Sequence, residues 1–402
     1  MKKVSSLIIC VLFIFGISLP SLLWVVSDTK EISDKEKRRL AQLPELRFDK
    51  SLFTEYPKQF EAFFNDHFGL KATLVDSNRI WQDAVFNKSA VRRIVQGEQG
   101  WMFLDVASSV YDHVELIELR ENVLPDWKQN LMNKKEWLNS LGIEYLFVPV
   151  PNKMTIYPEY LPNRISKHSG STMLDKLFMQ LDAGTPFKNY VNLETFLTLQ
   201  KKHDITKLTH IPEKNQQRND LYFHRDSHWT SLGAFLSYQH IIEQLQDIMP
   251  EQEPAISFDQ LISQSVEKKG DIARMGSLNR TELHQQLVIK APCSIQEPEV
   301  ISNFKETEAY KLKPKVLPSK RSCQNKSGRA VVVHDSFGVY LQPFFAESFK
   351  EVVFMPSYNL LGMESFLREF KPDIYIDIRV ERNVKYLLAP DKRLDEAVAN
   401  LK

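Results

Sequence analysis

Short apolar runs alternate with amphipathic helical patterns along this chain, and that rhythm restricts its possible folds more than any other feature. The clearest stretch begins at Arg329 and consists of an apolar run at 330–333, a helical pattern at about 337–349, an apolar run at 351–355, a helical pattern around 363–370 and a strand candidate at 373–380. Strands that alternate with helices predict an α/β fold, in which helices cover both faces of a mostly parallel sheet.

The same alternation occurs earlier in the chain. A helical pattern from Trp127 to Leu141 precedes Gly142, a residue suited to ending a helix, and the apolar run 143–150 follows. A second amphipathic helix is expected over about 234–248. With the C-terminal stretch, these segments predict one large α/β domain.

An apolar stretch near the N-terminus has the length of a membrane span. It covers the twenty residues from Leu7 to Val26, and Lys2 and Lys3 before it predict a cytoplasmic N-terminus. A cleaved signal peptide, with Gly16-Ile17-Ser18 at its cleavage site, is the alternative. We predict an uncleaved anchor, because the apolar residues continue well beyond Ser18.

These patterns predict a membrane anchor or signal at 1–27, a polar juxtamembrane spacer at 28–47 and a folded domain at 48–390. Within the domain, residues 250–328 are rich in prolines and polar residues, so we expect an insertion or a loosely structured edge there. Its strand candidates are 286–290 and 298–302. A sizeable core is expected, because 43% of all residues are hydrophobic. The net charge of +1 argues against a nucleic-acid partner, which would require a basic patch.

Cys293 and Cys323 are the two cysteines outside the apolar N-terminal stretch. If the domain faces an oxidising compartment, they could form a disulfide that closes a loop of about 30 residues. Two unrelated thiols are the alternative, because spacing in the sequence does not fix the distance between the Cα atoms.

The segment His334-Asp335-Ser336-Phe337-Gly338 directly follows the apolar run 330–333. In an open parallel sheet this position is the carboxyl end of a strand, where active sites collect. The N–H groups of a following helix could stabilise an oxyanion that develops at Ser336. The alternative is that Asp335 or Ser336 only caps that helix, a common task for these residues.

A second polar segment, Asp226-Ser227-His228-Trp229, precedes the helix expected at 234–248. In extended backbone, Asp226 and His228 would point the same way, so the carboxylate could orient the imidazole toward a serine. Two alternatives remain open here. His224, Asp226 and His228 alternate and could bind a metal, or the segment could be a polar loop anchored by Trp229.

The two segments together favour a catalytic site. An acid, a base and a serine are the groups that make a hydroxyl nucleophilic at neutral pH. The serine segment follows an expected strand, and the other segment precedes an expected helix that packs on the same sheet. Their joint occurrence therefore favours a single site formed by Ser336, His228 and Asp226.

The chain also resembles a known family, the alginate O-acetyltransferases of the AlgX/AlgJ type, which are similar to SGNH hydrolases. The resemblance rests on short motifs in the family's order: Glu36-Lys37-Arg38-Arg39-Leu40-Ala41 with Pro44, Asn65-Asp66-His67-Phe68-Gly69-Leu70, Gly100-Trp101-Met102-Phe103, Val148-Pro149-Val150-Pro151-Asn152-Lys153 with Tyr157-Pro158, Asp226-Ser227-His228-Trp229-Thr230, His334-Asp335-Ser336-Phe337-Gly338, Lys371-Pro372-Asp373 and Glu381-Arg382-Asn383. They extend over residues of about 30 to 385.

The resemblance implies an SGNH-like fold with Ser336 as nucleophile, His228 as base and Asp226 as the residue that orients the base. Two departures from the family pattern are present. His334-Asp335 precedes the serine where Gly-Asp is common, and the chain ends soon after the last strand, without room for the carbohydrate-binding module of AlgX-like members. The chain therefore looks closer to the shorter, membrane-anchored AlgJ-like type.

Four further residues are candidates for substrate binding. Asn152, Lys153 and Tyr157 follow the end of the expected strand 143–150, although a turn bounded by prolines is an adequate structural explanation. Arg382 follows the last expected strand in the same way.

We expect an O-acetyltransferase in the bacterial inner membrane whose periplasmic domain passes an acetyl group through Ser336 to hydroxyls of an exported, alginate-like polysaccharide. The resemblance implies a multispanning membrane-bound O-acyltransferase as the acetyl donor, and the chemistry requires no metal or organic cofactor. A membrane-anchored carbohydrate esterase would use the same residues, and a non-catalytic scaffold in a polysaccharide export complex is a third possibility.

Overall fold

The structure is a computed structural model, and it describes most of the chain beyond residue 91. The described residues are 11, 13–15, 18–19, 32–33, 38–46, 48, 51–68, 73–74, 77–78, 81, 91, 93–166, 170–202, 220–276, 278, 281–294, 299–301, 318–356 and 360–401. The chain divides into two compact units, one of residues 1–91 with 273–279 and the other of residues 92–272 with 280–402.

The described part of the first unit contains helices and short strands. Its elements are β1 (Ile32–Ser33), β2 (Arg38–Arg39), α2 (Ser51–Thr54) and α3 (Tyr56–His67). Asp66 and His67 at the end of α3 bind the main chain of Ala41: Asp66 Oδ2 accepts its N–H at 2.8 Å, and His67 Nε2 donates to its carbonyl at 2.9 Å. These two residues therefore have a structural role in this unit.

The expected membrane segment, Leu7 to Val26, lies mostly outside the described residues. None of the helices in the described part of the chain is both long enough and apolar enough to cross a membrane.

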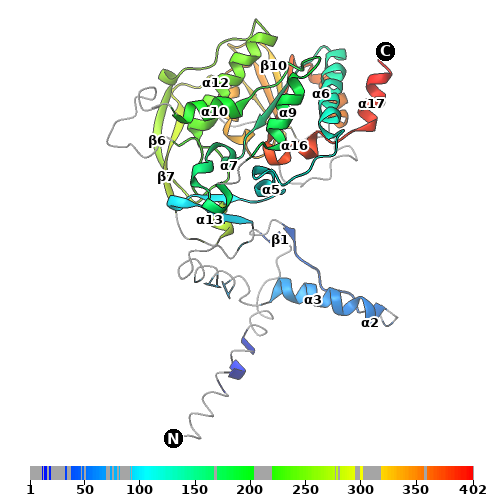
Figure 1. The fold of residues 1–402 in the computed structure, drawn as a ribbon, viewed down its shortest axis with the longest axis vertical. Coiled ribbons are helices and arrows are strands. Elements are labelled where there is room, and N and C mark those ends of the chain that lie inside the picture. Colours follow the sequence, from blue (N-terminus) through cyan, green and yellow to red (C-terminus); the bar gives the residue numbers. More distant parts are fainter. Residues whose placement is uncertain are drawn as a thin grey trace. The chain divides into compact units, whose positions relative to one another are not determined.

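The second unit is built on a six-stranded sheet (Figure 1). The strands lie in the order β5 (Glu144–Val150), β12 (Ile374–Val380), β10 (Arg329–His334), β11 (Glu351–Pro356), β9 (Ser319–Ser322) and β8 (Glu299–Val300). The first four are parallel, with Val332 of β10 opposite Phe354 of β11 and Ile376 of β12. β9 and β8 are antiparallel, so the mostly parallel sheet expected from the sequence is a mixed sheet with an antiparallel edge.

Helices cover both faces of this sheet, as the alternation predicted. Successive strand residues point to opposite faces, so Tyr145 and Phe147 pack with α6 (Val123–Ser140) and α9 (Met173–Asp182). Leu146 and Val148 pack with α10 (Leu193–Lys202) and α12 (Ser231–Ile248) on the other face. In Figure 1, the two pairs of helices lie on either side of β10. Both faces of the central strands are therefore buried, which explains why their sequences are mostly apolar, with the buried charges of Asp377 and Arg379 in β12 as exceptions.

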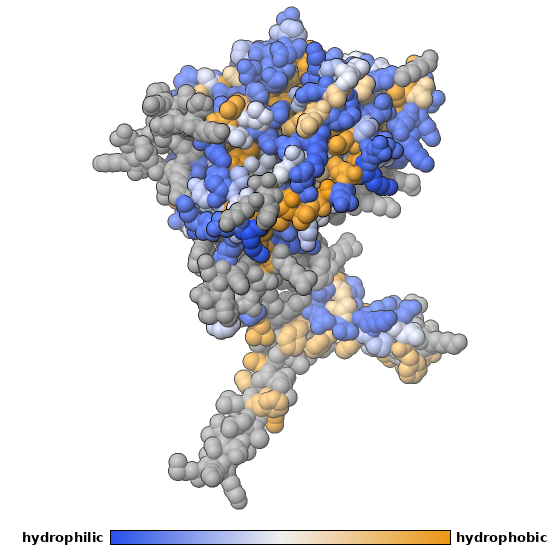
Figure 2. Space-filling model, viewed as in Figure 1, coloured by the Kyte–Doolittle hydropathy of each residue, from blue (hydrophilic) through white to orange (hydrophobic). Residues whose placement is uncertain are grey.

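The second unit has further elements outside this sheet and the four helices that cover it. They are β3 (Ile94–Gln96), η1 (Glu98–Gly100), β4 (Met102–Leu104), α5 (Ser109–His113), α7 (Lys153–Ile156), η2 (Pro158–Tyr160), α8 (Asn163–Ser166), η4 (Phe258–Gln260), β6 (Leu261–Lys268), β7 (Glu282–Ile289), η5 (Gly338–Tyr340), α14 (Gln342–Phe345), η6 (Leu361–Met363), α15 (Glu364–Phe370), α16 (Glu381–Leu387) and α17 (Lys392–Ala399). α13 (Asp271–Met275) contains residues of both units. On the face drawn in Figure 2, this unit is largely hydrophilic with smaller hydrophobic areas, which agrees with apolar residues gathered inside.

Within region 250–328, expected to be an insertion or a loosely structured edge, the described residues include regular strands. β6 and β7 form an antiparallel hairpin of eight paired residues each. The strand candidate at 286–290 belongs to β7, and the candidate at 298–302 contains β8.

A disulfide joins Cys293 and Cys323, whose Cα atoms are 5.2 Å apart. Cys323 directly follows β9, so the bridge ties the chain after β7 to the antiparallel edge of the sheet. Of the two possibilities for these cysteines, the structure has the bridge.

Candidate active site

The candidate residues gather at one edge of the sheet because the parallel strands end there. Ser336 lies two residues after β10, Asn152 two residues after β5 and Arg382 two residues after β12. The carboxyl ends of neighbouring parallel strands meet at the same edge, which is where ligand sites form in open α/β sheets.

Asp335 holds the turn that exposes Ser336. Its Oδ1 accepts the N–H of Phe337 at 3.1 Å, and its Oδ2 accepts the N–H of Val380 at 2.9 Å and the amide of Asn383 at 3.3 Å. Neither Asp335 nor Ser336 is the N-cap of the following helix η5, because that position is Phe337; Asp335 instead holds the turn together and ties it to the end of β12. Ser336 itself is exposed, and its hydroxyl lies within hydrogen-bond distance of His228.

The turn is followed by the 3₁₀ helix η5 and the short α14, so the single helix expected at 337–349 is wrong. Gly338 explains in part why the chain turns so tightly here. A Cβ at Gly338 would lie 2.3 Å from Cβ and 2.4 Å from Cγ of His334, so only glycine allows the turn to fold back on that side chain. His334 is buried, and burial lowers its pKa.

Asp226 and His228 lie on a loop, not on the extended backbone that we expected. The loop is closed by an antiparallel bridge between Tyr222 and Trp229 and contains bends at 224–228. Trp229 ties the loop to the serine turn, since its Nε1–H donates to the carbonyl of Phe337 at 3.2 Å.

Lys153 stabilises the same loop through hydrogen bonds to its main chain. Its Nζ donates to the carbonyls of Phe223 and His224 at 3.0 Å and of Asp226 at 2.8 Å. Burial lowers the pKa of Lys153 to about 7, with nearby carboxylates such as Asp226 opposing the shift.

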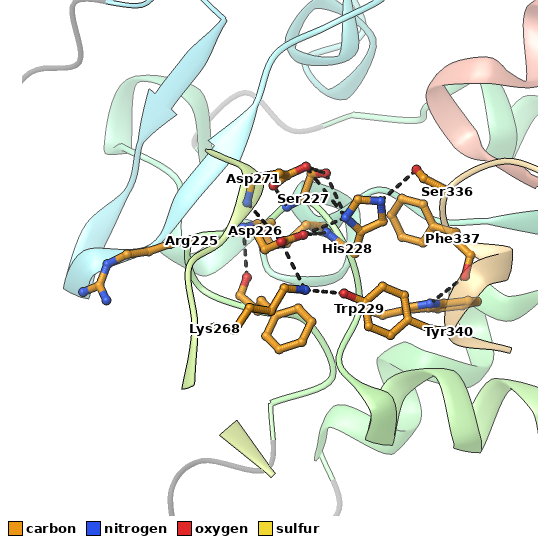
Figure 3. A network of polar contacts seen from close by, with 12 residues as sticks. Arg225, Asp226, Ser227, His228, Trp229, Lys268, Asp271, Ser336, Phe337 and Tyr340 are labelled. Carbon is orange, nitrogen blue, oxygen red and sulfur yellow. Dashed lines mark hydrogen bonds and ion pairs between the residues drawn. The ribbon is translucent and has the colours of Figure 1, made fainter. Parts of the chain in front are cut away.

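A continuous line of hydrogen bonds connects Ser336, His228 and Asp226 (Figure 3). The Ser336 hydroxyl lies 2.7 Å from His228 Nε2, and His228 Nδ1 lies 2.6 Å from Asp226 Oδ1. A carboxylate oxygen only accepts, so Nδ1 carries the proton and Nε2 is free to accept from the serine. This tautomer is the one that removes a proton from a serine hydroxyl.

Asp226 is held as a carboxylate by donors on both of its oxygens. Oδ1 also accepts the main-chain N–H of His228 at 3.0 Å, while Oδ2 accepts the N–H of Asp271 at 3.0 Å and lies 3.2 Å from Lys268 Nζ. Burial alone would raise the pKa of Asp226, but the contacts with His228, Lys268 and Asp271 outweigh it and hold that pKa well below its usual range.

The His-x-Asp-x-His pattern does not gather as a metal site. His224 turns away, with its Nε2 2.7 Å from Asp220 and its ring stacked on Trp101 at 4.3 Å. In the described part of the chain, Asp226, His228 and Asp271 lie close enough to reach one ion. However, both oxygens of Asp226 already accept N–H donors, which fits a hydrogen-bonded carboxylate better than a metal ligand.

The candidates for substrate binding surround this site with different degrees of access. Arg382 donates to Asn152 Oδ1 at 3.0 Å and lies 5.4 Å above the Phe337 ring. Lys153 is buried under the loop, and the Tyr157 hydroxyl accepts the N–H of Leu221 at 2.8 Å. Arg382 thus contacts the serine turn through the Phe337 ring, and a substrate contact by any of the four remains a prediction.

Lys268, Asp271 and Tyr340 are the site neighbours that the sequence reasoning missed. Ser227 is bound by Asp271, whose Oδ1 accepts its N–H at 2.7 Å and whose Oδ2 accepts its hydroxyl at 2.6 Å. The glycine in the sequence Lys-Lys-Gly-Asp at 268–271 could have indicated this neighbourhood. A Cβ at Gly270 would lie 2.1 Å from the Arg225 carbonyl, so this glycine marks where the segment passes close to the loop.

Comparisons with known proteins show which proteins this chain is similar to. No curated protein sequence matches it significantly. Solved structures with a similar course include Bacillus cereus PatB1 with a sulfonyl adduct (16% identity, 72% of this chain and 97% of that chain, TM-score 0.47) and the O-acetyltransferase domain of Pseudomonas putida AlgJ (14%, 77% and 99%, TM-score 0.46). Pseudomonas aeruginosa AlgX follows with 13% identity, 74% of this chain, 68% of that chain and a TM-score of 0.43.

The family model "SGNH hydrolase-like domain, acetyltransferase AlgX" matches residues 94–308, more than half of the 402 residues. The match contains Asp226 and His228 and ends before Ser336. The chain therefore belongs to the AlgX family of SGNH hydrolase-like acetyltransferases.

Proposed function

We propose that this chain is an extracytoplasmic O-acetyltransferase that transfers an acetyl group, through a covalent ester on Ser336, to a hydroxyl of an exported polysaccharide. The observation that carries the proposal is the hydrogen-bonded line of Ser336, His228 and Asp226 in an AlgX-family acetyltransferase domain. An alginate-like acceptor is the substrate class that the family suggests.

The geometry supports a two-step reaction. In the first step, His228 takes the proton of the Ser336 hydroxyl while Oγ attacks the acetyl carbonyl, and the donor leaves with that proton. In the second step, His228 takes the proton of a sugar hydroxyl, the sugar oxygen attacks the acetyl-serine, and Ser336 leaves as a hydroxyl with the proton from His228. Asp226 keeps the imidazole in its reactive tautomer during both steps.

The backbone N–H of Ser336 is our candidate for stabilising the oxyanion of each tetrahedral intermediate. The next two N–H groups are engaged, because Phe337 donates to Asp335 Oδ1 and Gly338 donates to the Asp335 carbonyl. The Ser336 N–H donates to none of the residues that the structure describes.

The location and the partners are part of the same proposal. A disulfide between Cys293 and Cys323 is typical of an oxidising compartment, which supports a domain outside the cytoplasm. Residues 1–27 would hold this domain at the inner membrane. Activated acetyl groups are made in the cytoplasm, so a multispanning membrane acyltransferase would have to deliver the acetyl group to Ser336.

Replacement of the nucleophile tests this function. Ser336→Ala should abolish acetylation of the polysaccharide in cells while the protein folds and accumulates normally, because alanine has no oxygen to accept the acetyl group. The measurement is the O-acetyl content of purified polysaccharide from strains that carry either form. Unchanged acetylation would rule out the proposed function.

A second assay separates a transferase from an esterase that uses the same residues. The purified domain would be supplied with an acetyl ester and oligosaccharides, and acetylated sugar and free acetate would be measured together. A transferase forms acetylated sugar faster than it releases acetate. Release of acetate alone would identify an esterase.

A further inference from the structure

Lys268 lies at the end of β6 and contacts both segments that carry the reactive groups. Its Nζ is 3.2 Å from Asp226 Oδ2 and is hydrogen-bonded to the hydroxyl of Tyr340 (Figure 3). Asp226 belongs to the loop of His228, and Tyr340 lies four residues after Ser336. One ammonium group therefore bridges the acid of the site and the segment of the nucleophile.

Aromatic rings fix the position of this ammonium group. Lys268 Nζ lies 3.8 Å from the centroid of the Phe223 ring and 4.9 Å from that of the Tyr340 ring. Such cation–π contacts favour a charged amine over a neutral one. Phe223 itself lies on the loop between the bridged residues Tyr222 and Trp229, so Lys268 is held on two sides by the parts that it joins.

We propose that Lys268 is a positioning residue for the reaction: it holds Asp226 and the Ser336 segment in register and limits the affinity of His228 for a proton. The inference rests on the proposed role of Ser336 as the nucleophile. Lys268 acts through Asp226 and Tyr340 and does not itself contact the reacting atoms.

The second part of the role follows from the charges around His228. Its neighbours are mostly acidic or neutral: Asp226, Asp271 with Oδ2 at 3.7 Å, and the hydroxyls of Ser227 and Ser336 at 3.4 and 2.7 Å, beside the rings of Phe337 and Tyr340 at 4.8 and 5.9 Å. Two carboxylates alone would stabilise protonated imidazole and leave less of the free base. A cation on Asp226 opposes that effect.

The other cations of this region have different contacts. Lys153 Nζ lies on main-chain carbonyls below the loop, and Arg382 lies over the Phe337 ring and binds Asn152. Among the cations that the structure describes near the site, Lys268 is the one in contact with a carboxylate oxygen of Asp226, so its charge opposes the effect of Asp226 on His228 most directly.

The rate at which a fluorophosphonate labels Ser336 as a function of pH tests the inference in the full chain. This reagent reports activation of Ser336 without any acetyl donor or sugar. In the native protein, labelling should increase with pH as His228 loses its proton. We call the pH range over which this rate rises the acid limb. In Lys268→Met, protonated His228 gains stability because a nearby positive charge is gone, so the acid limb should shift to higher pH by about 0.5–1 pH unit.

Three further variants distinguish charge from packing. Lys268→Arg should restore the native position of the acid limb, because the positive charge returns. Tyr340→Phe should leave the acid limb in place, because the cation remains on Asp226, but should lower the plateau rate of labelling, because the link to the Ser336 segment is lost. Lys320→Met is the matched control, since Lys320 also forms ion pairs, with Glu299 at 3.1 Å and Glu351 at 3.6 Å, on the antiparallel edge strand β9. It should change neither the limb nor the plateau.

A folded Lys268→Met protein with an unmoved acid limb would overturn the inference and leave only a packing role. If that variant does not fold, Lys268→Gln retains a polar side chain without the charge and should show the same upward displacement; an unmoved limb there has the same meaning. Absence of Ser336 labelling in the native protein would instead contradict the proposed function itself, and the inference with it.

Discussion

At the scale of single residues, Glu381 shows how the site is supported from behind. It is buried directly before Arg382, and its Oε2 accepts the N–H of Asn152 and the hydroxyl of Thr155, both at 2.7 Å. Burial raises the pKa of Glu381 to about 7, although the two hydrogen bonds oppose the shift. The folded chain therefore binds a proton here at pH values where an unfolded glutamate is ionised.

This proton makes stability depend on pH. Between the unfolded pKa near 4.5 and the folded pKa of about 7, only the folded state holds the proton, so stability decreases as pH rises through that window. Glu381→Gln keeps an acceptor oxygen but cannot ionise. We expect it to match the native protein at pH 4.5 and to exceed its unfolding free energy by about 1–3 kcal/mol at pH 8.

Urea denaturation of both proteins at several pH values measures this difference, and groups that the two share cancel in the comparison. Parallel stability curves for the native protein and Glu381→Gln would show that folding does not raise the pKa of Glu381. Asn152 and Arg382 remain in place in both proteins, which keeps the comparison local.

Residue chemistry also separates what the sequence could predict from what it could not. Ser336, His228 and Asp226 were predicted because each stands in a motif beside a strand or helix end, and the structure brings their polar atoms within hydrogen-bond distance. Lys268 lies 40 residues beyond His228 on a hairpin with no catalytic motif. Its contact with Asp226 depends on where β6 ends, which local pattern does not determine.

At the scale of elements, the four parallel strands were predictable because their burial on both faces leaves continuous apolar runs. The antiparallel strand β9 was missed, since Ser319–Ser322 is polar and only partly buried, whereas β8 lies within the strand candidate at 298–302. The turn after β10 was also misjudged. Its helical pattern predicts one helix, whereas the structure has η5 and the short α14 after a turn in which Gly338 packs closely on His334.

Gly338→Ala tests the importance of this turn. The new Cβ would lie within 2.7 Å of three His334 atoms, so His334 or the turn must move, and Ser336 lies two residues away. A displacement of about 1 Å at a reacting group can reduce the rate on the order of 100-fold. We therefore expect Ser336 labelling by a fluorophosphonate to slow by about 10- to 100-fold.

Val339→Ala is the control for that experiment, because Val339 is the next residue in η5 and its side chain is exposed. It should label at the native rate. A native rate in Gly338→Ala would mean that the site tolerates a rearranged turn, and would remove the steric argument for glycine at this position.

At the scale of the whole molecule, the disulfide connects parts that the sheet alone does not hold together. Cys293 follows the β6–β7 hairpin, which carries Lys268, and Cys323 follows β9. Glu347 reinforces the same junction, since its carboxylate accepts the N–H groups of Cys293 at 2.8 Å and Ser294 at 3.1 Å. The bridge thus restrains the hairpin against the antiparallel edge of the sheet.

Removal of the bridge should act mainly on the unfolded chain. A disulfide that closes a loop of about 30 residues reduces the freedom of the unfolded state, so the double variant Cys293→Ser with Cys323→Ser should lose about 3 kcal/mol of unfolding free energy. The measurement is chemical denaturation with and without reductant, and reductant should not affect the double variant. The native fold retains the contacts of Glu347 and the β6–β7 pairing, so labelling of Ser336 should keep its native rate in the folded variant. A slower rate with unchanged stability would contradict this account, because it would mean that the bridge acts on the geometry of the folded site and not on the freedom of the unfolded chain.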